Sequence, residues 1–115
     1  MIILSYEEKF NILNELNKNH DVKKPFEERD LGEFANYDFC WIEDLPTKDE
    51  GNYQWLGGAV YRLLINKEET NMTFMENWVR SGLYDPEFYY KYEYEELCLC
   101  EQFKRVITDW KIIYE

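Results

Sequence analysis

The sequence has little of what most catalytic sites need. It contains one histidine, His20, in 115 residues. It has no nucleophile elbow built on serine, no phosphate-binding glycine-rich loop followed by Lys and Ser or Thr, and no His-Glu-x-x-His motif. His20 lies in a polar run beside Asp21, which is typical of a solvated loop residue rather than a general base. We therefore expect that the protein is not an enzyme and has no catalytic residues.

Cysteine is also scarce. Cys40, Cys98 and Cys100 are an odd number without paired spacing, so we interpret them as buried thiols in a reducing compartment. A zinc site made of these three cysteines and His20 is an alternative, but the sequence lacks the two closely spaced pairs of ligands that such sites normally show. A small hydrolase that uses clustered carboxylates and a divalent cation is a weaker hypothesis. We predict no metal and no cofactor.

Long hydrophobic runs are missing as well. The longest, "WLGGAVYRLLI", contains Arg62 and is too short to span a bilayer. The start "MIILSYEEKF" reaches an acidic residue at Glu7, unlike a secretory signal. We expect a cytoplasmic protein without a membrane partner.

Glycine and proline are few, with five and three residues, and no linker rich in them divides the chain. Hydrophobic residues make up 45% and aromatic residues 18%, which excludes intrinsic disorder. We expect one globular domain over residues 1–115.

Negative charge is abundant and local. The net charge is −11. Residues 27–50 carry −7 and residues 85–101 carry −5, so the rest of the chain is close to neutral. Such fields repel nucleic acid and anionic membrane and attract basic surfaces. We therefore predict no direct nucleic-acid binding.

The expected fold class is α+β and predominantly helical. Ser5 and Glu8 form a capping box, and a first helix would bury Tyr6, Phe10, Leu13 and Leu16. Pro25 would start a short helix, residues 37–44 would form a strand, and residues 45–52 a loop. Residues 53–65 fit either a strand pair broken at Gly57 and Gly58 or a buried helix.

The last third gives the strongest helical pattern. Thr73 and Glu76 resemble a second capping box, for a short helix that Gly82 would end. Asp85 and Pro86 then suit the start of a long C-terminal helix. Its apolar stripe would contain seven residues: Phe88, Tyr92, Leu99, Phe103, Val106, Trp110 and Ile113. Tyr90 and Tyr94 would project from the opposite side of this helix.

The stretch "YDPEFYYKYEYEE", residues 84–96, interleaves tyrosines with carboxylates. Carboxylates spaced along a rigid element can approximate the phosphates of a duplex strand, and exposed tyrosines are good anchors at protein interfaces. We therefore expect a non-catalytic inhibitor that binds the basic nucleic-acid-binding surface of a nucleic-acid-processing enzyme. The expected contact residues are Glu87, Tyr90, Glu93, Tyr94 and Glu96, with Glu27, Glu28, Asp30, Glu43, Asp44, Asp49 and Glu50 as a second patch.

In size, charge and lack of catalytic motifs, the chain resembles the compact acidic proteins that phages use against defence systems. Anti-CRISPR proteins are among these, and immunity proteins that neutralise nuclease toxins have the same character. The resemblance implies a nucleic-acid mimic that acts through a protein partner. The alternative is a structural or scaffold module that forms a homodimer through the apolar stripe of the C-terminal helix.

Overall fold

The computed structural model describes residues 1–31, 36–51, 53–82, 90–103 and 109–115, and of Arg29, Tyr90 and Asp109 it describes the backbone alone. The helical elements are the α-helix α1 (Tyr6–Asn19) and the 3-10 helix η1 (Glu28–Leu31). The strands are β1 (Tyr37–Gly51), β2 (Gln54–Ile65), β3 (Glu68–Gly82), β4 (Tyr90–Tyr94), β5 (Cys98–Phe103) and β6 (Asp109–Ile112).

The strands form one antiparallel sheet in the order β1-β2-β3-β5-β6, and β4 also pairs with β3. β4 and β5 share the same edge of β3. Residues 90–94 pair with residues 78–82, and residues 98–100 pair with residues 73–75. The two short strands are therefore two parts of one edge, separated by the bend at residues 95–97.

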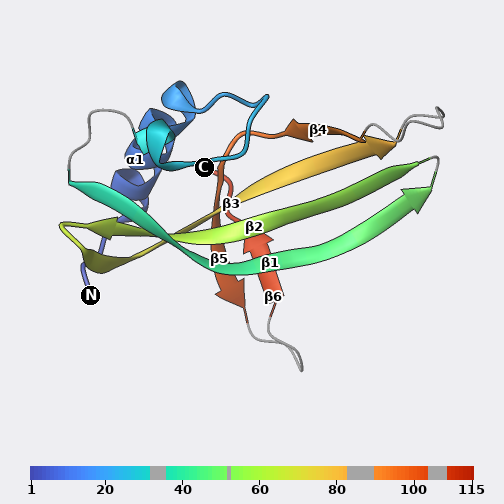
Figure 1. Cartoon of the computed structure of the whole chain (residues 1–115). Coiled ribbons are helices and arrows are strands. Elements are labelled where there is room, and N and C mark those ends of the chain that lie inside the picture. Colours follow the sequence, from blue (N-terminus) through green and yellow to red (C-terminus); the bar gives the residue numbers. More distant parts are fainter. Residues whose placement is uncertain (32–35, 52, 83–89, 104–108) are drawn as a thin grey trace.

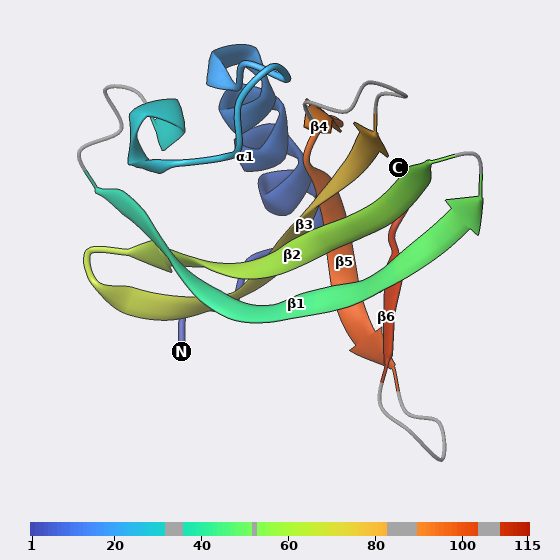
Figure 2. The same ribbon diagram turned by 45° about the vertical axis from the view of Figure 1, so that its right-hand side comes forward.

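The helix α1 covers only one end of this sheet. Figures 1 and 2 show α1 and η1 over the curved face at one end, while the other ends of β1, β2 and β3 project beyond them. The radius of gyration of 15.6 Å agrees with this shape, since a compact chain of this length would have about 13 Å. Among the described residues, no helix covers this projecting part of the sheet.

The predicted N-terminal helix is confirmed. The Ser5 hydroxyl accepts a hydrogen bond from the Glu8 N–H, and the Glu8 carboxylate accepts one from the Ser5 N–H, each at 3.1 Å. Leu13 and Leu16 are buried against the sheet. Tyr6 was expected in the core, but it is 53% exposed and donates a hydrogen bond to Glu101.

Both faces of the sheet contribute to a core. On the face below α1, the buried side chains include Leu16, Phe26, Leu63, Phe74 and Leu99. A smaller cluster of Val60, Met75 and Cys100 lies on the opposite face, with Trp110 and Ile112 packed against it. Because β5 is buried on both faces, its sequence does not show a clean alternation of polar and apolar residues.

The predicted fold class is wrong, because the sheet dominates the structure and the long C-terminal helix does not exist. Tyr92 lies on β4, Leu99 and Phe103 on β5 and Trp110 on β6, while Ile113 follows β6. Phe88, Val106 and the expected helix start at Asp85 and Pro86 lie outside the described residues. Spacings of three and four residues arise readily in a chain so rich in aromatic and apolar residues, and these also have high β propensity. The homodimer interface that was predicted on the apolar stripe of this helix is therefore wrong as well.

Three expectations for the middle of the chain are also wrong. Residues 45–51, expected as loop, continue strand β1. Residues 54–65 form one continuous strand across Gly57 and Gly58, neither a strand pair nor a helix. Thr73 and Glu76 lie in β3 and cap no helix; the Thr73 hydroxyl instead donates to the Cys100 carbonyl at 2.6 Å. Of the helix expected after Pro25, the single 3-10 turn η1 is present.

Candidate interaction surface

Four aromatic side chains lie side by side on the half of the sheet that projects beyond α1. Paired residues of antiparallel strands share a face, and Trp55 pairs with Arg80, Arg80 with Tyr92, and Trp78 with Tyr94. We call Trp55, Trp78, Tyr92 and Tyr94 the aromatic row. It continues the core face outward, because Phe74, Glu76 and Trp78 alternate along the same side of β3.

Ring contacts hold the aromatic row in place. The Arg80 guanidinium lies 4.6 Å from the centroid of the Trp55 ring, in cation–π geometry. Trp78 meets Tyr92 edge to face at 5.6 Å, and the Tyr92 and Tyr94 rings are stacked at 6.2 Å with 13° between their planes. The rings are preorganised by their neighbours, although Tyr92 is 41% exposed.

Gly57 makes room for this arrangement. A Cβ atom at position 57 would overlap the indole of Trp78, the residue that pairs with Gly57 across the β2–β3 ladder. The indole therefore occupies the space that a side chain at position 57 would fill. Gly57, where the sequence pattern allowed a break between two strands, is a close-packing position that shapes the aromatic row.

Several of the predicted contact residues border the aromatic row. Asp44 pairs with Ala59 and Asp49 pairs with Trp55, so both share the face of the row, and both are exposed. Glu43 pairs with Val60 and belongs to the opposite face, and Glu50 is exposed near the strand end. Glu93 lies on β4 between the two stacked tyrosines in sequence, and because it pairs with Val79 its side chain belongs to the opposite face. Of these predicted contact residues, Asp44 and Asp49 therefore share the face of the aromatic row.

Other predicted contact residues are separated from this surface. Glu27 and Glu28 are exposed at the start of η1. Glu96 is exposed beside α1. Glu87 and the side chain of Tyr90 lie outside the described residues, although the Tyr90 backbone belongs to β4. The expectation that Tyr94 and Tyr92 lie on opposite sides is wrong, because residues two apart on a strand share a face.

Asp30 cannot contact a partner, because it is buried. Its residue exposure is 2%, and its carboxylate oxygen Oδ2 accepts a hydrogen bond from the Glu27 N–H at 2.9 Å. The same oxygen lies 3.2 Å from Nδ1 of His20. The prediction that Asp30 belongs to an exposed acidic patch is therefore wrong.

His20 is the centre of a buried polar cluster, contrary to the prediction of a solvated loop residue. Its side chain is 1% exposed and lies between Asp30 and Glu76, with Nε2 at 2.8 Å from Glu76 Oε2. This second contact is electrostatic, because the N–H direction does not give it hydrogen-bond geometry. The Phe26 N–H donates to both oxygens of Glu76 at 3.0 Å. We call His20, Asp30 and Glu76 the histidine–carboxylate cluster.

Burial of this cluster changes its electrostatics. Desolvation raises the pKa of Glu76, and the carboxylate of Asp30 raises it further, while the Phe26 N–H and His20 oppose the change. Burial also raises the pKa of Tyr61 to about 12, with Glu76 as the largest charge that contributes. Since the three side chains have almost no exposed surface, the cluster cannot reach a substrate and acts as an anchor for residues 20–31. No local sequence pattern indicated it, because its members come from three separate elements.

The anchored segment forms one wall of a groove beside the aromatic row. The groove has a volume of about 500 Å³ and is lined by Val22, Lys23, Lys91, Tyr92, Glu93 and Tyr94. The Tyr94 N–H donates to the Val22 carbonyl at 3.1 Å, which fixes this wall to β4. Lys91 is held by Glu93 at 3.4 Å.

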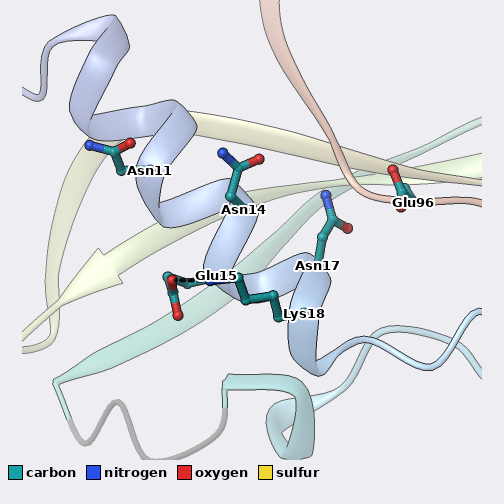
Figure 3. A pocket seen from close by; sticks show the side chains of 6 residues that line it. All are labelled: Asn11, Asn14, Glu15, Asn17, Lys18 and Glu96. Atoms are coloured by element: carbon teal, nitrogen blue, oxygen red, sulfur yellow. Dashed lines mark hydrogen bonds and ion pairs between the residues drawn. The ribbon is translucent and has the colours of Figure 1, made fainter.

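A second hollow, of about 690 Å³, lies beside α1 (Figure 3). It is lined by Asn11, Asn14, Glu15, Asn17, Lys18 and Glu96. Lys18 and Glu15 form an ion pair at 2.9 Å. The Asn17 amide is used structurally, since it donates to the Leu97 carbonyl and accepts from the Leu97 N–H. Of the predicted contact residues, only Glu96 lines this hollow.

The cysteines are free thiols, and Cys100 is buried. Within the described ranges, no group of three or more His, Cys, Asp and Glu residues is placed to hold a metal ion. Over the same ranges, no helix combines the length and hydropathy that crossing a membrane requires.

Comparisons with known proteins found no match to a family model, to a curated protein or to a solved structure.

Proposed function

We propose that the protein is a non-catalytic inhibitor that docks the aromatic row and its acidic borders onto a basic protein surface, in particular the nucleic-acid-binding surface of a nucleic-acid-processing enzyme. The observation that carries the proposal is the position of Asp44 and Asp49 on the same face as the aromatic row, on a part of the sheet that α1 leaves uncovered (Figure 1).

The chemistry of this surface suits a basic partner. The carboxylates of Asp44 and Asp49 attract Lys and Arg side chains and speed the encounter. The rigid aromatic rings beside them supply contact area at low entropic cost and can stack on guanidinium groups. A net charge of −11 opposes binding to nucleic acid itself, so competition for the basic site is the consistent mode of action.

Affinity capture on the tagged protein, eluted in steps of rising salt and followed by mass spectrometry, tests the proposal in its first stage. The expected result is a basic nucleic-acid enzyme that elutes at intermediate salt. In the second stage, the purified chain is added to this enzyme together with its nucleic-acid substrate. Inhibition that is stoichiometric and relieved by excess substrate supports the proposal. An enzyme that binds the chain but keeps full nucleic-acid binding contradicts it.

A matched pair of variants links inhibition to the surface. The variant Asp49→Lys places a positive charge beside Trp55 and is expected to weaken inhibition about ten-fold or more. The control Glu68→Lys reverses an exposed charge that contacts the N-terminus at the other end of the sheet, and it should leave inhibition unchanged. Equal effects of the two variants would show that total charge, not this surface, is responsible.

A further inference from the structure

The backbone N–H and C=O groups of β4 point alternately toward β3 and toward the groove. In an antiparallel ladder, successive residues direct their N–H and C=O groups to opposite sides of the strand. The Glu95 N–H donates to the Asn77 carbonyl of β3 at 2.9 Å, whereas the Tyr94 N–H donates outward to Val22. Tyr92, two residues before Tyr94, therefore directs its N–H and C=O outward as well. The backbone N–H and C=O groups of Lys91 and Glu93 point toward β3.

The outward backbone groups of Tyr92 have no hydrogen-bond partner among the described residues. Within the part of the chain that the structure describes, no hydrogen bond reaches the Tyr92 N–H or C=O from the groove side, and no strand other than β3 pairs with β4. The groove of about 500 Å³ runs along this edge. The single bond from Tyr94 to Val22 shows that the edge accepts the carbonyl of an extended segment.

The other edge beside the aromatic row is protected against strand addition. β1 contains Pro46, and its register with β2 shifts at three places along the strand. Bulges, proline and charges are the means by which proteins block pairing at an edge. The pairing of β4 with β3 is regular throughout residues 90–94.

We propose that the outer edge of β4 is a strand-addition site for an extended, arginine-containing segment of the partner protein. Main-chain hydrogen bonds to Tyr92 would give affinity, and alternate side chains of the segment would lie over the stacked rings of Tyr92 and Tyr94. Guanidinium groups stack well on such rings. Lys23, Lys91 and Glu93 also line the groove, Lys91 and Glu93 form an ion pair, and the net charge of −11 attracts a cationic segment. This inference rests on the proposed function for the basic character of the partner, but its test needs no partner enzyme.

The test uses the synthetic peptide acetyl-(Arg-Val)4-amide and the full chain labelled with ¹⁵N. Binding is expected to shift the amide signals of Val22, Lys23, Tyr92 and Tyr94 and to slow hydrogen exchange of the Tyr92 amide at least ten-fold. Two control peptides carry N-methyl groups on all arginines or on all valines. Since only alternate residues of an added strand pair with β4, one of these should bind at least ten-fold more weakly than the other.

Simple charge attraction predicts a different result, because both methylated peptides keep the same charge. Equal binding of the two, shifts centred on the β1 acids, or no binding at all would overturn the inference. The variant Tyr92→Ala should weaken binding about ten-fold, while Tyr114→Ala, at a residue 84% exposed near the C-terminus, should not. If the peptide fails but the chain still inhibits its enzyme, the strand-addition inference falls and the proposed function stands.

Discussion

The imidazole Nε2 of His20 lies 2.8 Å from Oε2 of Glu76, which joins the end of α1 to the middle of β3. The side chains of both residues are almost completely buried, at 1% and 4% exposure. Asp30 lies on the other side of the ring. The segment that carries Val22 and Lys23, one wall of the groove, is therefore attached to the sheet through the histidine–carboxylate cluster.

The variant His20→Ala should be strongly destabilised. It would leave the carboxylates of Asp30 and Glu76 buried without the ring between them. Removal of one partner from a buried ionic group costs about 3–5 kcal/mol of the free energy of unfolding. Urea denaturation followed by circular dichroism measures this loss. The control Lys24→Ala, at an exposed position in the same segment, should stay within about 0.5 kcal/mol of the unmodified chain, and a similar value for His20→Ala would contradict the cluster as an anchor.

Glu76 should make stability fall as the pH rises above its ordinary pKa of 4.5. Burial raises the pKa of Glu76 in the folded chain, so above pH 4.5 the folded state keeps a proton that the unfolded state has released. The contribution of this group to the free energy of unfolding therefore decreases until the pH passes the folded pKa. The variant Glu76→Gln cannot titrate, and urea denaturation between pH 4.5 and 8 should show a shallower decrease for it. Identical slopes for the two chains would remove Glu76 as the cause.

Gly57→Ala should destabilise the chain by disturbing Trp78. The added methyl group would overlap the indole, and forced overpacking typically costs about 1–3 kcal/mol. The near-ultraviolet circular dichroism of the aromatic row should change at the same time. The same substitution in a Trp78→Ala background tests the cause, since the cost of Gly57→Ala should then nearly disappear. If Gly57→Ala still destabilises the chain in the Trp78→Ala background, the cause lies in the backbone of β2 and not in contact with the indole.

The sequence predicted the elements whose signals are local, and it missed those that depend on distant partners. Ser5 and Glu8 lie within one turn, so their capping box was recognisable and the helix that it begins is present. The pattern of Thr73 and Glu76 is the same in form, but Glu76 is held by His20 and the Phe26 N–H in the core, which no spacing reveals. Tertiary contacts decided the structure there.

Part of the acidic and aromatic surface was also recognisable. The alternation in "YKYEY" is the pattern of a half-buried strand. It was assigned to a helix with Tyr92 on the buried stripe, whereas Tyr92 is exposed on β4 and Tyr94 is half-buried. Trp55 and Trp78 were missed as members of the surface. Their proximity depends on the register of β2 against β3 and on the space at Gly57, and neither follows from local sequence.

Cys100 should be the least reactive of the three thiols. Burial raises the pKa of Cys100 to about 12, so very little thiolate, the reactive form, is present at pH 8. Brief treatment of the folded chain with iodoacetamide should leave Cys100 unmodified in peptide mass spectra, while the half-buried Cys40 becomes labelled. In concentrated urea all three cysteines should react at similar rates. Equal labelling of Cys40 and Cys100 in the folded chain would contradict the burial of Cys100.

Charge reversal should separate two carboxylates that are close in the sequence. Glu93 lies on β4 and lines the groove that Tyr92 and Tyr94 also line, whereas Glu96 lies beyond the bend, beside α1. Glu93→Lys should therefore weaken binding of the partner enzyme about ten-fold, measured by titration at low salt, and the loss should shrink as salt rises. Glu96→Lys changes the net charge by the same amount, so it controls for long-range attraction, and a small effect is expected. If the two variants weaken binding equally, the contact is not centred on β4 and the acidic charge acts only at a distance.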